Sequence, residues 1–543
     1  MIRIVRRAEL SEAERRVWDA FPRGDWADLR GDPDPDGDPD PGGDPDPDGD
    51  PGPDPMAAPA ASPHAAGVDT HADPALDDGG ELVPHGHTDL PERPRVRAEV
   101  RAEVLSALLQ SAPVPADGRM PALRLRGARI TGRIALSFGR VEVPVHLDDC
   151  VLDVAPHLTG AAVRSLELYA CRLPGLDGRL LAVSGDLRLA DCEVDGCLML
   201  EDATISGSVS IGGSRLLNRG GRALSGGGMS VGGGFFARRG VCAQGSVRLI
   251  GARIDGGLFF EGASLSHPDG AGLCVDEVVT TRIICADGFR CEGEVQLRGA
   301  QVSGEVNLYA ASLRAKGKAL RARGLSAGEL ILAPAQVSGL VDLTRARVGA
   351  LRDSRATWPT RLRLDGFGYD QLLPLGEPID VRARCAWLAR DADLYRPHPY
   401  EQLAGYYRRL GHDHDARRVM VAKQRRRRRT LSPPARVAGY LLDGLVGYGY
   451  RAWLAALWLG VLLVAGTSVF AARPPLALDP AHQPHVDAFV YTLDLMIPIG
   501  AFGLRSTFVP VGGTRWVAYG LIAAGWILAT ALIAGVGRSL RRD

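Results

Sequence analysis

The chain has 543 residues, of which 45% are hydrophobic and 24% are charged, and its 64 basic and 64 acidic residues give a formal net charge of zero at pH 7. This length provides for several domains, and the balanced charge argues against nucleic acid or another bulk polyanion as a partner. The charges are nevertheless segregated. Residues 32–55 contain ten Asp and no basic residue, whereas an unbroken basic run occurs later: Arg425, Arg426, Arg427, Arg428 and Arg429. Such segregation is typical of a protein oriented at a membrane.

The N-terminal part divides into three predicted segments. Residues 1–31 form a short helical segment, residues 32–92 a disordered linker rich in Asp, Pro and Gly, and residues 93–112 a helix that caps the following domain. The linker repeats Asp-x-Asp-x-Asp-Gly, as an EF-hand loop does. However, Gly43 and Pro55 stand where the liganding glutamate is needed, so calcium binding is not expected.

A repeat dominates the middle of the chain. A Gly-x-hydrophobic-x-hydrophobic phrase returns about every eleven residues, and these phrases belong to a longer repeat of 46 to 49 residues. Four glycines open equivalent phrases of the longer repeat: Gly196, Gly245, Gly293 and Gly339. Self-similarity at a fixed period indicates a solenoid.

The pattern inside one phrase indicates strands. Apolar residues alternate in short pairs that small residues and glycines interrupt, and such short strands are stable only when stacked on the next coil. We therefore predict a mainly β fold in which residues 113–365 form a parallel β-helix. If two phrases make one coil, it has roughly ten coils and a length of roughly 50 Å.

The cysteines predict no metal or redox site. There are nine, with no Cys-x-x-Cys pair among them, so neither a zinc site nor thioredoxin-type chemistry is indicated. Cys192 occupies a position that alanine takes in other phrases. It is therefore expected to be a small buried core residue.

A helical region follows the repeats. Residues 366–395 are predicted to be a connector and residues 396–430 a basic helical hairpin with its turn near Gly411, docked on the end of the solenoid. The basic run at its end is predicted to lie on anionic lipid at the membrane surface. His412 and His414 alternate with aspartates near the turn, where a solvated loop is expected rather than a metal site.

Two uncharged apolar runs, residues 452–472 and 516–537, have 21 and 22 residues. This length suffices for a helix to cross a bilayer, so we predict two transmembrane helices. Residues 431–472 then comprise an interfacial segment and the first span, residues 473–515 an extracytoplasmic loop with an amphipathic segment, and residues 516–543 the second span and a basic tail. Arginines precede the first span and follow the second. Because basic residues favour the cytoplasmic side, both termini and the solenoid are predicted to be cytoplasmic, at the inner (plasma) membrane.

The segment 488–503 lies between the two predicted spans, as a pore helix and filter lie in a two-span potassium channel. A channel-like protein is therefore a remote alternative. The residues 499–503, Ile-Gly-Ala-Phe-Gly, do not reproduce a Thr-Val-Gly-Tyr-Gly filter. An interfacial or partly re-entrant helix is the preferred interpretation.

A family resemblance is carried by WDAFPRGDWADLR, LRLRGARITG, the Gly-x-Val-x-Leu phrases, HPYEQLAGYYRRLGHDHDARR and VGYGYRAWLAALWLG. Together they resemble an actinobacterial, Streptomyces-type family of β-solenoid membrane proteins labelled membrane-associated oxidoreductase. The resemblance covers nearly the whole chain except the Asp-Pro-Gly tract. It implies redox activity at the membrane, with a flavin or nicotinamide if the label holds, but no catalytic motif of the family can be carried over to these residues.

The residues themselves do not indicate catalysis. The sequence contains no dinucleotide-binding Gly-x-Gly-x-x-Gly between a strand and a helix, and no P-loop, Gly-x-Ser-x-Gly or His-Glu-x-x-His. Outward arginines on the coils, such as Arg188, Arg248 and Arg298, could form a stripe. We therefore expect a non-catalytic scaffold anchored to the lipid bilayer, which presents its solenoid to a cytosolic protein partner or to copies of itself. A membrane-associated oxidoreductase is the alternative.

Overall fold

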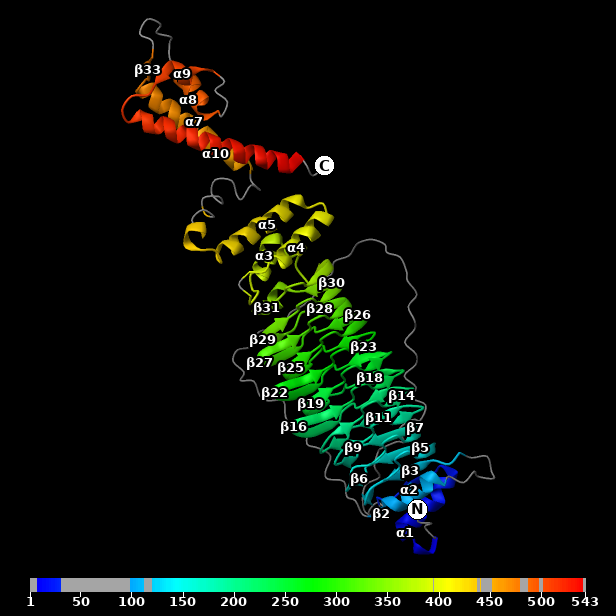
Figure 1. Ribbon diagram of the computed structural model, residues 1–543. Coiled ribbons are helices and arrows are strands. Elements are labelled where there is room, and N and C mark those ends of the chain that lie inside the picture. The colour runs from blue at the N-terminus through cyan, green and yellow to red at the C-terminus, as the bar shows by residue number, and fades with distance from the viewer. Residues whose placement is uncertain are drawn as a thin grey trace, which may run out of the picture.

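The computed structural model describes residues 7–30, 98–111, 120–393, 395–436, 440, 452–478, 487–497 and 502–540. The chain forms a long parallel β-solenoid of about eleven turns, with helices at both of its ends and a further group of helices near the C-terminus (Figure 1). The prediction of a parallel β-helix with roughly ten coils is confirmed. The predicted disordered linker, residues 32–92, lies outside the described residues, as do most of the residues between 437 and 451.

Two sheets run along the solenoid, and within them every strand pairs in parallel with a strand one coil away. The larger sheet, sheet A, contains β1 (Trp26–Asp28), β3 (Leu123–Arg126), β5 (Arg140–Asp148), β7 (Ala162–Tyr169), β10 (Ala182–Val183), β11 (Leu187–Ala190), β14 (Thr204–Ile205), β15 (Val209–Ser210), β17 (Ser230–Val231), β18 (Gly234–Phe236), β20 (Arg253–Ile254), β21 (Gly257–Phe259), β23 (Val279–Thr280), β24 (Ile283–Ile284), β26 (Gln301–Asn307), β28 (Ser326–Leu332), β30 (Arg347–Asp353) and β32 (Gly368–Pro374).

The second sheet, sheet B, lies on the other side of each coil. It contains β2 (Ala98–Arg101), β4 (Ala128–Thr131), β6 (Val151–Leu152), β8 (Arg172–Leu173), β9 (Leu176–Asp177), β12 (Glu193–Val194), β13 (Leu198–Met199), β16 (Arg215–Ser225), β19 (Cys242–Arg248), β22 (Ser264–Cys274), β25 (Arg290–Gln296), β27 (Ser312–Arg321), β29 (Gln336–Asp342) and β31 (Arg361–Arg363).

The eleven-residue phrase corresponds to half a coil. Leu180, Asp191, Asp202 and Gly213 follow one another at intervals of eleven residues, and all have a positive φ, between 53° and 71°. Each therefore reverses the chain direction at a corner between the two sheets. Aspartate and glycine tolerate this left-handed conformation better than most residues. Two such corners complete one coil, as the sequence predicted.

The longer repeat arises because alternate coils are enlarged. In sheet B the pairing register shifts between Leu217 and Arg222 in β16, and between Ser266 and Ala271 in β22. A similar shift occurs between Arg314 and Lys318 in β27. The extra residues bulge outward in every second coil, so the sequence period spans two coils.

Three of the four glycines that define the repeat lie beside the enlarged coils, and the fourth, Gly196, lies beside Pro174 and Gly175 of the preceding coil. Gly196, Gly245, Gly293 and Gly339 have φ values between 128° and 152°. A Cβ on Gly293 would lie 2.5 Å from the carbonyl oxygen of His267, and a Cβ on Gly245 would lie 2.5 Å from that of Asn218. These glycines therefore give the neighbouring coil room to approach.

The interior of the solenoid is apolar and continuous. Cys150, Cys171 and Cys192 stack in consecutive coils at 0–1% exposure, which confirms the prediction of a small buried residue at position 192. Each thiol donates a hydrogen bond to a carbonyl oxygen of the preceding coil, as Cys192 does to Leu168 at 3.5 Å. In the next coil the hydroxyl of Ser214 takes over this role.

The N-terminal end of the solenoid begins earlier than the sequence predicted. Strand β1 pairs with β3, and β2 pairs with β4, so residues 26–30 and 98–101 belong to one coil that residues 31–97 interrupt. The 3-10 helix η1 (Arg7–Glu9), α1 (Glu12–Ala20), the 3-10 helix η2 (Phe21–Arg23) and α2 (Ala102–Gln110) cover this end (Figure 1). The predicted capping helix, residues 93–112, is therefore shorter, because residues 98–101 form a strand before it.

The C-terminal end extends further than predicted. Strand β32 adds a last rung within the predicted connector, residues 366–395, and the 3-10 helix η3 (Arg355–Thr357) precedes β31. Helices α3 (Val381–Leu388), α4 (His398–Arg409) and α5 (Asp413–Arg428) follow, and their buried residues belong to the same core as the solenoid. They lie at the opposite end from α1 and α2 (Figure 1). Both ends of the core are thus covered by helices.

The last part of the chain has a separate core. It contains α7 (Ala452–Ala472), β33 (Leu476–Ala477), α8 (Ala488–Met496), α9 (Leu504–Thr507), β34 (Phe508–Val509) and α10 (Thr514–Leu540), which pack around Phe470 and Tyr491. We call this part the apolar helical module. Among the described residues, no helix is both long enough and apolar enough to cross a membrane. The two predicted transmembrane spans therefore have no support from the described residues.

Candidate functional site

A buried ion pair attaches α3 to the solenoid, and we call α3, α4 and α5 together the helical cap. Asp353 ends strand β30, and its two carboxylate oxygens accept hydrogen bonds from the guanidinium of Arg384 in α3, at 2.6 and 2.8 Å. Trp358 donates a further hydrogen bond to Asp353 at 2.7 Å. Both charged residues are at most 2% exposed, so each charge is compensated inside the core. This pair fixes α3, and with it the positions of α4 and α5.

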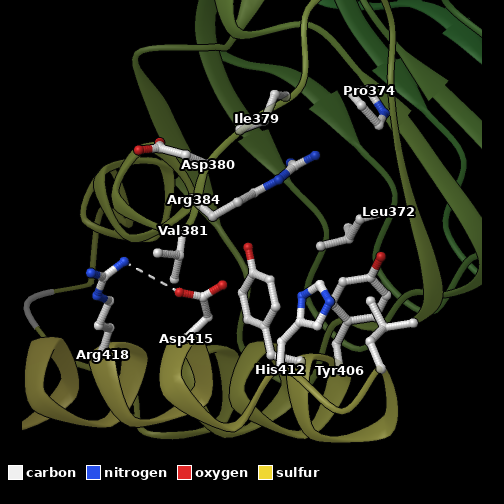
Figure 2. A pocket seen from close by; sticks show the side chains of 12 residues that line it. Leu372, Pro374, Ile379, Asp380, Val381, Arg384, Tyr406, His412, Asp415 and Arg418 are labelled. Carbon is white, nitrogen blue, oxygen red and sulfur yellow. Dashed lines mark hydrogen bonds and ion pairs between the residues drawn. The ribbon is translucent and has the colours of Figure 1, made fainter.

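A cavity of about 370 Å³ lies between β32 and the three cap helices (Figure 2). Both arginines of its lining form ion pairs. Arg384 binds Asp353, and Arg418 forms an ion pair with Asp415 at 3.3 Å. His412 stacks on Tyr407 with ring centroids 6.4 Å apart. The two arginines of the lining are therefore each paired with a carboxylate, and the cavity lies between the cap and the last coil.

The predicted basic run lies at the C-terminal end of α5. Four of its arginines, Arg425 to Arg428, form the last turn of the helix, and Arg429 is its C-cap. Positive charge is favourable there because the helix dipole leaves its negative end at the C-terminus. The run is not uniformly exposed: Arg426 and Arg428 are half-buried, whereas Arg425, Arg427 and Arg429 are exposed.

Part of this run lines a second cavity, of about 280 Å³, which we call the arginine pocket. It is lined by Cys385, Ala389, Tyr400, Ala422, Arg425, Arg426, Arg428, Arg429, Arg436 and Tyr440. Arg427 is absent from this lining. The guanidinium of Arg428 lies 3.8 Å from the ring centroid of Tyr440, a cation–π contact that joins α5 to the chain that follows it.

Two side chains at the floor of the arginine pocket have raised pKa values. Burial raises the pKa of Tyr400 to about 12, although the nearby Arg426 opposes this shift. Burial also raises the pKa of Cys385 to about 11. Tyr400 is therefore a neutral hydroxyl group at physiological pH, and Cys385 a neutral thiol.

Arg436 and Tyr440 are not part of the predicted basic run, residues 425–429. Both follow the Ser-Pro-Pro-Ala stretch at 432–435, where helical residues begin again after α5. Proline is common in the first turn of a helix, so this stretch signals a new helical turn that returns beside the basic run.

The apolar helical module holds the short helix α8 between α7 and α10. Two glycines provide the space. A Cβ on Gly466 in α7 would lie 2.5 Å from the methyl group of Thr492, and a Cβ on Gly525 in α10 would lie 2.2 Å from the carbonyl oxygen of Met496. The segment 488–503, for which the sequence favoured an interfacial or re-entrant helix, is thus partly a helix enclosed by two longer ones.

Asp494 is fully buried at the C-terminal end of α8. Its carboxylate accepts hydrogen bonds from the backbone N–H groups of Phe502 and Arg505, both at 3.0 Å. Arg505 in turn donates to the backbone carbonyls of Leu495 and Ile497. These bonds fold the chain after α8 back against the end of the helix.

The outer faces of α7 and α10 carry large apolar side chains in contact with solvent. On α7, Leu457 is 52%, Val461 48% and Val464 68% exposed, and on α10, Trp526 is 51% and Ile527 60% exposed. Soluble monomers rarely expose several large apolar side chains together, and such surfaces mark contact with a partner or a membrane.

Two cysteines of the solenoid have raised pKa values. Burial raises the pKa of Cys197 and Cys274 to about 11, so these thiols stay protonated and weakly nucleophilic. Among the described residues, no group of three or more His, Cys, Asp and Glu side chains is arranged to hold a metal ion. His414 is exposed, as predicted, but it lies in the first turn of α5 and not in the predicted loop.

The three arginines named for a possible stripe, Arg188, Arg248 and Arg298, do not lie on one face of the solenoid. Arg188 lies in β11 of sheet A, Arg248 lies in β19 of sheet B, and Arg298 lies in the turn between β25 and β26. Arg298 instead forms an ion pair with Asp276 at 2.6 Å. These arginines occur in similar sequence phrases. However, successive phrases lie in different sheets, so the arginines do not line up along the solenoid.

Comparisons with protein-family models, curated proteins and solved structures find no match for this chain.

Proposed function

We propose that the protein is a non-catalytic scaffold in which a rigid β-solenoid is attached to a phospholipid bilayer through the apolar helical module and the basic end of α5. The observation that carries the proposal is the set of large apolar side chains exposed on α7 and α10. Burial of apolar surface in a lipid phase is favourable by about 25 cal/mol per Å². Leaving these side chains in water would forgo that free energy.

The distribution of charge supports the same attachment. Helix α7 contains no charged residue over its 21 residues, and the basic end of α5 precedes it in the chain. A basic segment next to an apolar helix is favoured at the anionic cytoplasmic surface of a membrane. In this orientation the solenoid lies in the cytoplasm, and we retain the two predicted membrane passes as part of the proposal.

The form of the solenoid supports a scaffold role. Helices cover both ends of its core, which disfavours end-to-end stacking of copies and leaves the long sides of the two sheets as the available surfaces. We propose that these sides bind a cytosolic protein or the side of a second copy. Chemical cross-linking of the full chain in cells tests this part, and repeated failure to recover either product would contradict it.

Flotation of the purified full chain on neutral phosphatidylcholine vesicles tests the membrane attachment. The double variant Val464→Lys with Ile527→Lys places two charges on the exposed faces of α7 and α10. The matched control, Tyr169→Lys with Tyr309→Lys, changes two side chains of the solenoid that are 53% and 51% exposed. A lysine at the centre of a membrane helix costs on the order of 3 kcal/mol. We expect the first variant to float poorly and the control to float like the unmodified chain.

The oxidoreductase activity implied by the family resemblance is the competing function. It requires a bound redox cofactor, so the ultraviolet–visible spectrum of the purified full chain distinguishes the two. A stoichiometric flavin, or micromolar binding of a nicotinamide, would replace the scaffold proposal. The scaffold proposal predicts a spectrum with tyrosine and tryptophan absorption alone.

A further inference from the structure

The two sheets of the solenoid end differently at the helical cap. In sheet B an extended piece of the same chain covers the last strand, β31. The N–H of Leu362 donates to the carbonyl oxygen of Arg390 at 3.2 Å, and the carbonyl oxygen of Leu362 accepts from the N–H of Ala392 at 2.7 Å. Leu362 and Asp391 thereby form a parallel bridge. A short extended segment thus takes the place of a further strand at this edge.

In sheet A the last strand, β32, pairs with β30 and with no other strand of the described residues. The N–H of Gly368 donates to the carbonyl oxygen of Ala346, in the preceding coil, at 2.9 Å. Backbone groups of successive residues in a strand point to opposite edges. The N–H and C=O groups of Tyr369, Gln371 and Leu373 are therefore directed away from β30, to the outer edge of the sheet.

Helix α4 covers only the first part of this outer edge. The side-chain amide of Gln402 donates to the carbonyl oxygen of Tyr369 at 2.7 Å. Over the part of the chain that the structure describes, no hydrogen bond outside the pairing with β30 involves the backbone of Gln371 or Leu373. Unpaired N–H and C=O groups at the edge of a sheet are a template for a further strand. We call the backbone of residues 371–373 the free edge.

The cavity of about 370 Å³ between β32 and the helical cap lies along the free edge. Leu372 and Pro374 line it from the strand, Ile379 and Val381 line it from the start of α3, and Leu410 lines it from the end of α4 (Figure 2). All five side chains are aliphatic. The cavity therefore offers an apolar site beside backbone groups that have no partner.

We propose that the free edge binds an extended peptide segment of another protein, which adds a strand to sheet A and places an aliphatic side chain in the cavity. The alternating donors and acceptors of the edge match the backbone of an extended peptide, and the cavity selects its side chain. Sheet B already carries such a segment at the equivalent place, supplied by residues 390–392. The inference goes beyond the proposed scaffold, because it assigns one peptide-binding site, and it is independent of membrane attachment.

The chain itself supplies a probe for this site. A peptide with the sequence of β28, Ser-Ala-Gly-Glu-Leu-Ile-Leu, forms a strand of sheet A in the folded chain and buries Leu330 and Leu332. The fluorescently labelled peptide is titrated with the full chain in a neutral detergent, and binding is followed by fluorescence polarisation. We expect saturable binding.

Methylation of backbone nitrogens in the probe tests whether it binds as a strand. One probe is methylated at the positions of Glu329 and Ile331, and the other at the positions of Leu330 and Leu332. Only one of these two sets of N–H groups can face the free edge. We expect one methylated probe to bind on the order of tenfold more weakly and the other to bind like the unmodified probe. Equal binding of the two methylated probes would overturn strand addition.

Variants of the full chain locate the site. Gln371→Pro removes an N–H from the free edge, where proline is tolerated because this N–H is not part of the pairing with β30. Leu410→Asp places a charge at the cavity, and its matched control, Tyr309→Asp, changes a side chain of the solenoid with the same exposure of 51%. We expect Gln371→Pro and Leu410→Asp each to weaken binding on the order of tenfold, and the control to bind the probe like the unmodified chain.

The remaining outcomes would overturn the proposal. Failure of the unmodified chain to bind the probe, or equal binding by Leu410→Asp and Tyr309→Asp, would show that the free edge and its cavity are not a peptide site. A chain with a Gly-Ser linker in place of residues 31–97 provides a further arm. If it binds the probe clearly more tightly than the full chain, that segment competes for the edge, and the assignment to another protein is wrong. None of these measurements involves vesicles, so they leave the membrane attachment to its own test.

Discussion

Glu14 and Arg101 are 87 residues apart in the sequence, yet they form the ion pair that closes the N-terminal end of the solenoid. The guanidinium of Arg101 donates to both carboxylate oxygens of Glu14 at 2.8 Å, and its backbone N–H donates to one of them at 3.0 Å. Glu14 also accepts from the backbone N–H of Ser11, which completes the capping box of α1. One carboxylate thus joins α1 to the first rung of sheet B.

Removal of the Glu14 charge should destabilise this end. In Glu14→Gln the amide cannot accept the full set of hydrogen bonds, and the guanidinium of Arg101 loses its counter-ion. We expect a loss of about 1–3 kcal/mol in unfolding free energy, measured by thermal denaturation followed by circular dichroism. The exposed pair Arg7–Asp19 provides the control, since Asp19→Asn should cost less than about 1 kcal/mol. Equal effects of the two substitutions would contradict this account.

The same interaction should depend on pH. Burial alone would raise the pKa of Glu14, but hydrogen bonds from Arg101 and Ser11 outweigh it and lower the pKa from 4.5 to about 2. Because the folded-state pKa is lowered, the stabilisation is fully present above the unfolded-state pKa and is lost as the pH falls from 4.5 toward about 2. The difference in melting temperature between the unmodified chain and Glu14→Gln should therefore shrink over this window. A constant difference would show that the charge of Glu14 is not involved.

The segment 31–97 should be dispensable for folding. Its ends lie at adjoining positions of one coil, because the N–H of Leu29 donates to Arg126 at 2.9 Å and Ala98 pairs with Ala128. Replacing the segment with a short Gly-Ser linker closes a much smaller loop, which stabilises the chain by about 2 kcal/mol in the simple loop-entropy estimate. Thermal denaturation should show an equal or higher melting temperature, and loss of the folded state would contradict the arrangement of the first coil.

The repeat glycines should differ sharply from a glycine on a bulge. Gly293 has φ 131°, and a Cβ there would lie 2.5 Å from a backbone oxygen of the adjacent coil. Gly293→Ala is therefore expected to cost about 2 kcal/mol or more. A Cβ on Gly317 meets nothing within 4 Å, so Gly317→Ala should change stability by less than about 1 kcal/mol. Denaturant titration of both variants measures the two changes in unfolding free energy. Equal changes would show that the spacing of the coils does not depend on Gly293.

The architecture of the middle of the chain was predictable because the eleven-residue period is visible in the sequence. Each phrase ends at a corner, such as Asp191 or Asp202, where the left-handed conformation recurs. The first rung was not predictable from local pattern. Strand β1 has three residues, and its partner β3 begins nearly one hundred residues later, so no period connects them.

The candidate site was predictable only in part. The charge of the basic run is plain in the sequence, but the distinction between Arg427 and Arg428 is not. It depends on which side of α5 meets Tyr400 and on the return of the chain at Tyr440, and both are properties of tertiary packing. The bulges of the enlarged coils appear in the sequence only as the longer period of 46 to 49 residues. Their positions within the coil were not predictable, because a bulge adds residues without changing the alternation around it.

Alkaline extraction of cell membranes that contain the full chain tests the central claim most directly. High pH strips proteins held by surface charge, whereas proteins held by apolar helices remain with the lipid. Our account predicts that the chain stays in the membrane pellet, and that Val464→Lys with Ile527→Lys moves it toward the supernatant. Complete release of the unmodified chain into the supernatant would contradict attachment through the apolar helical module.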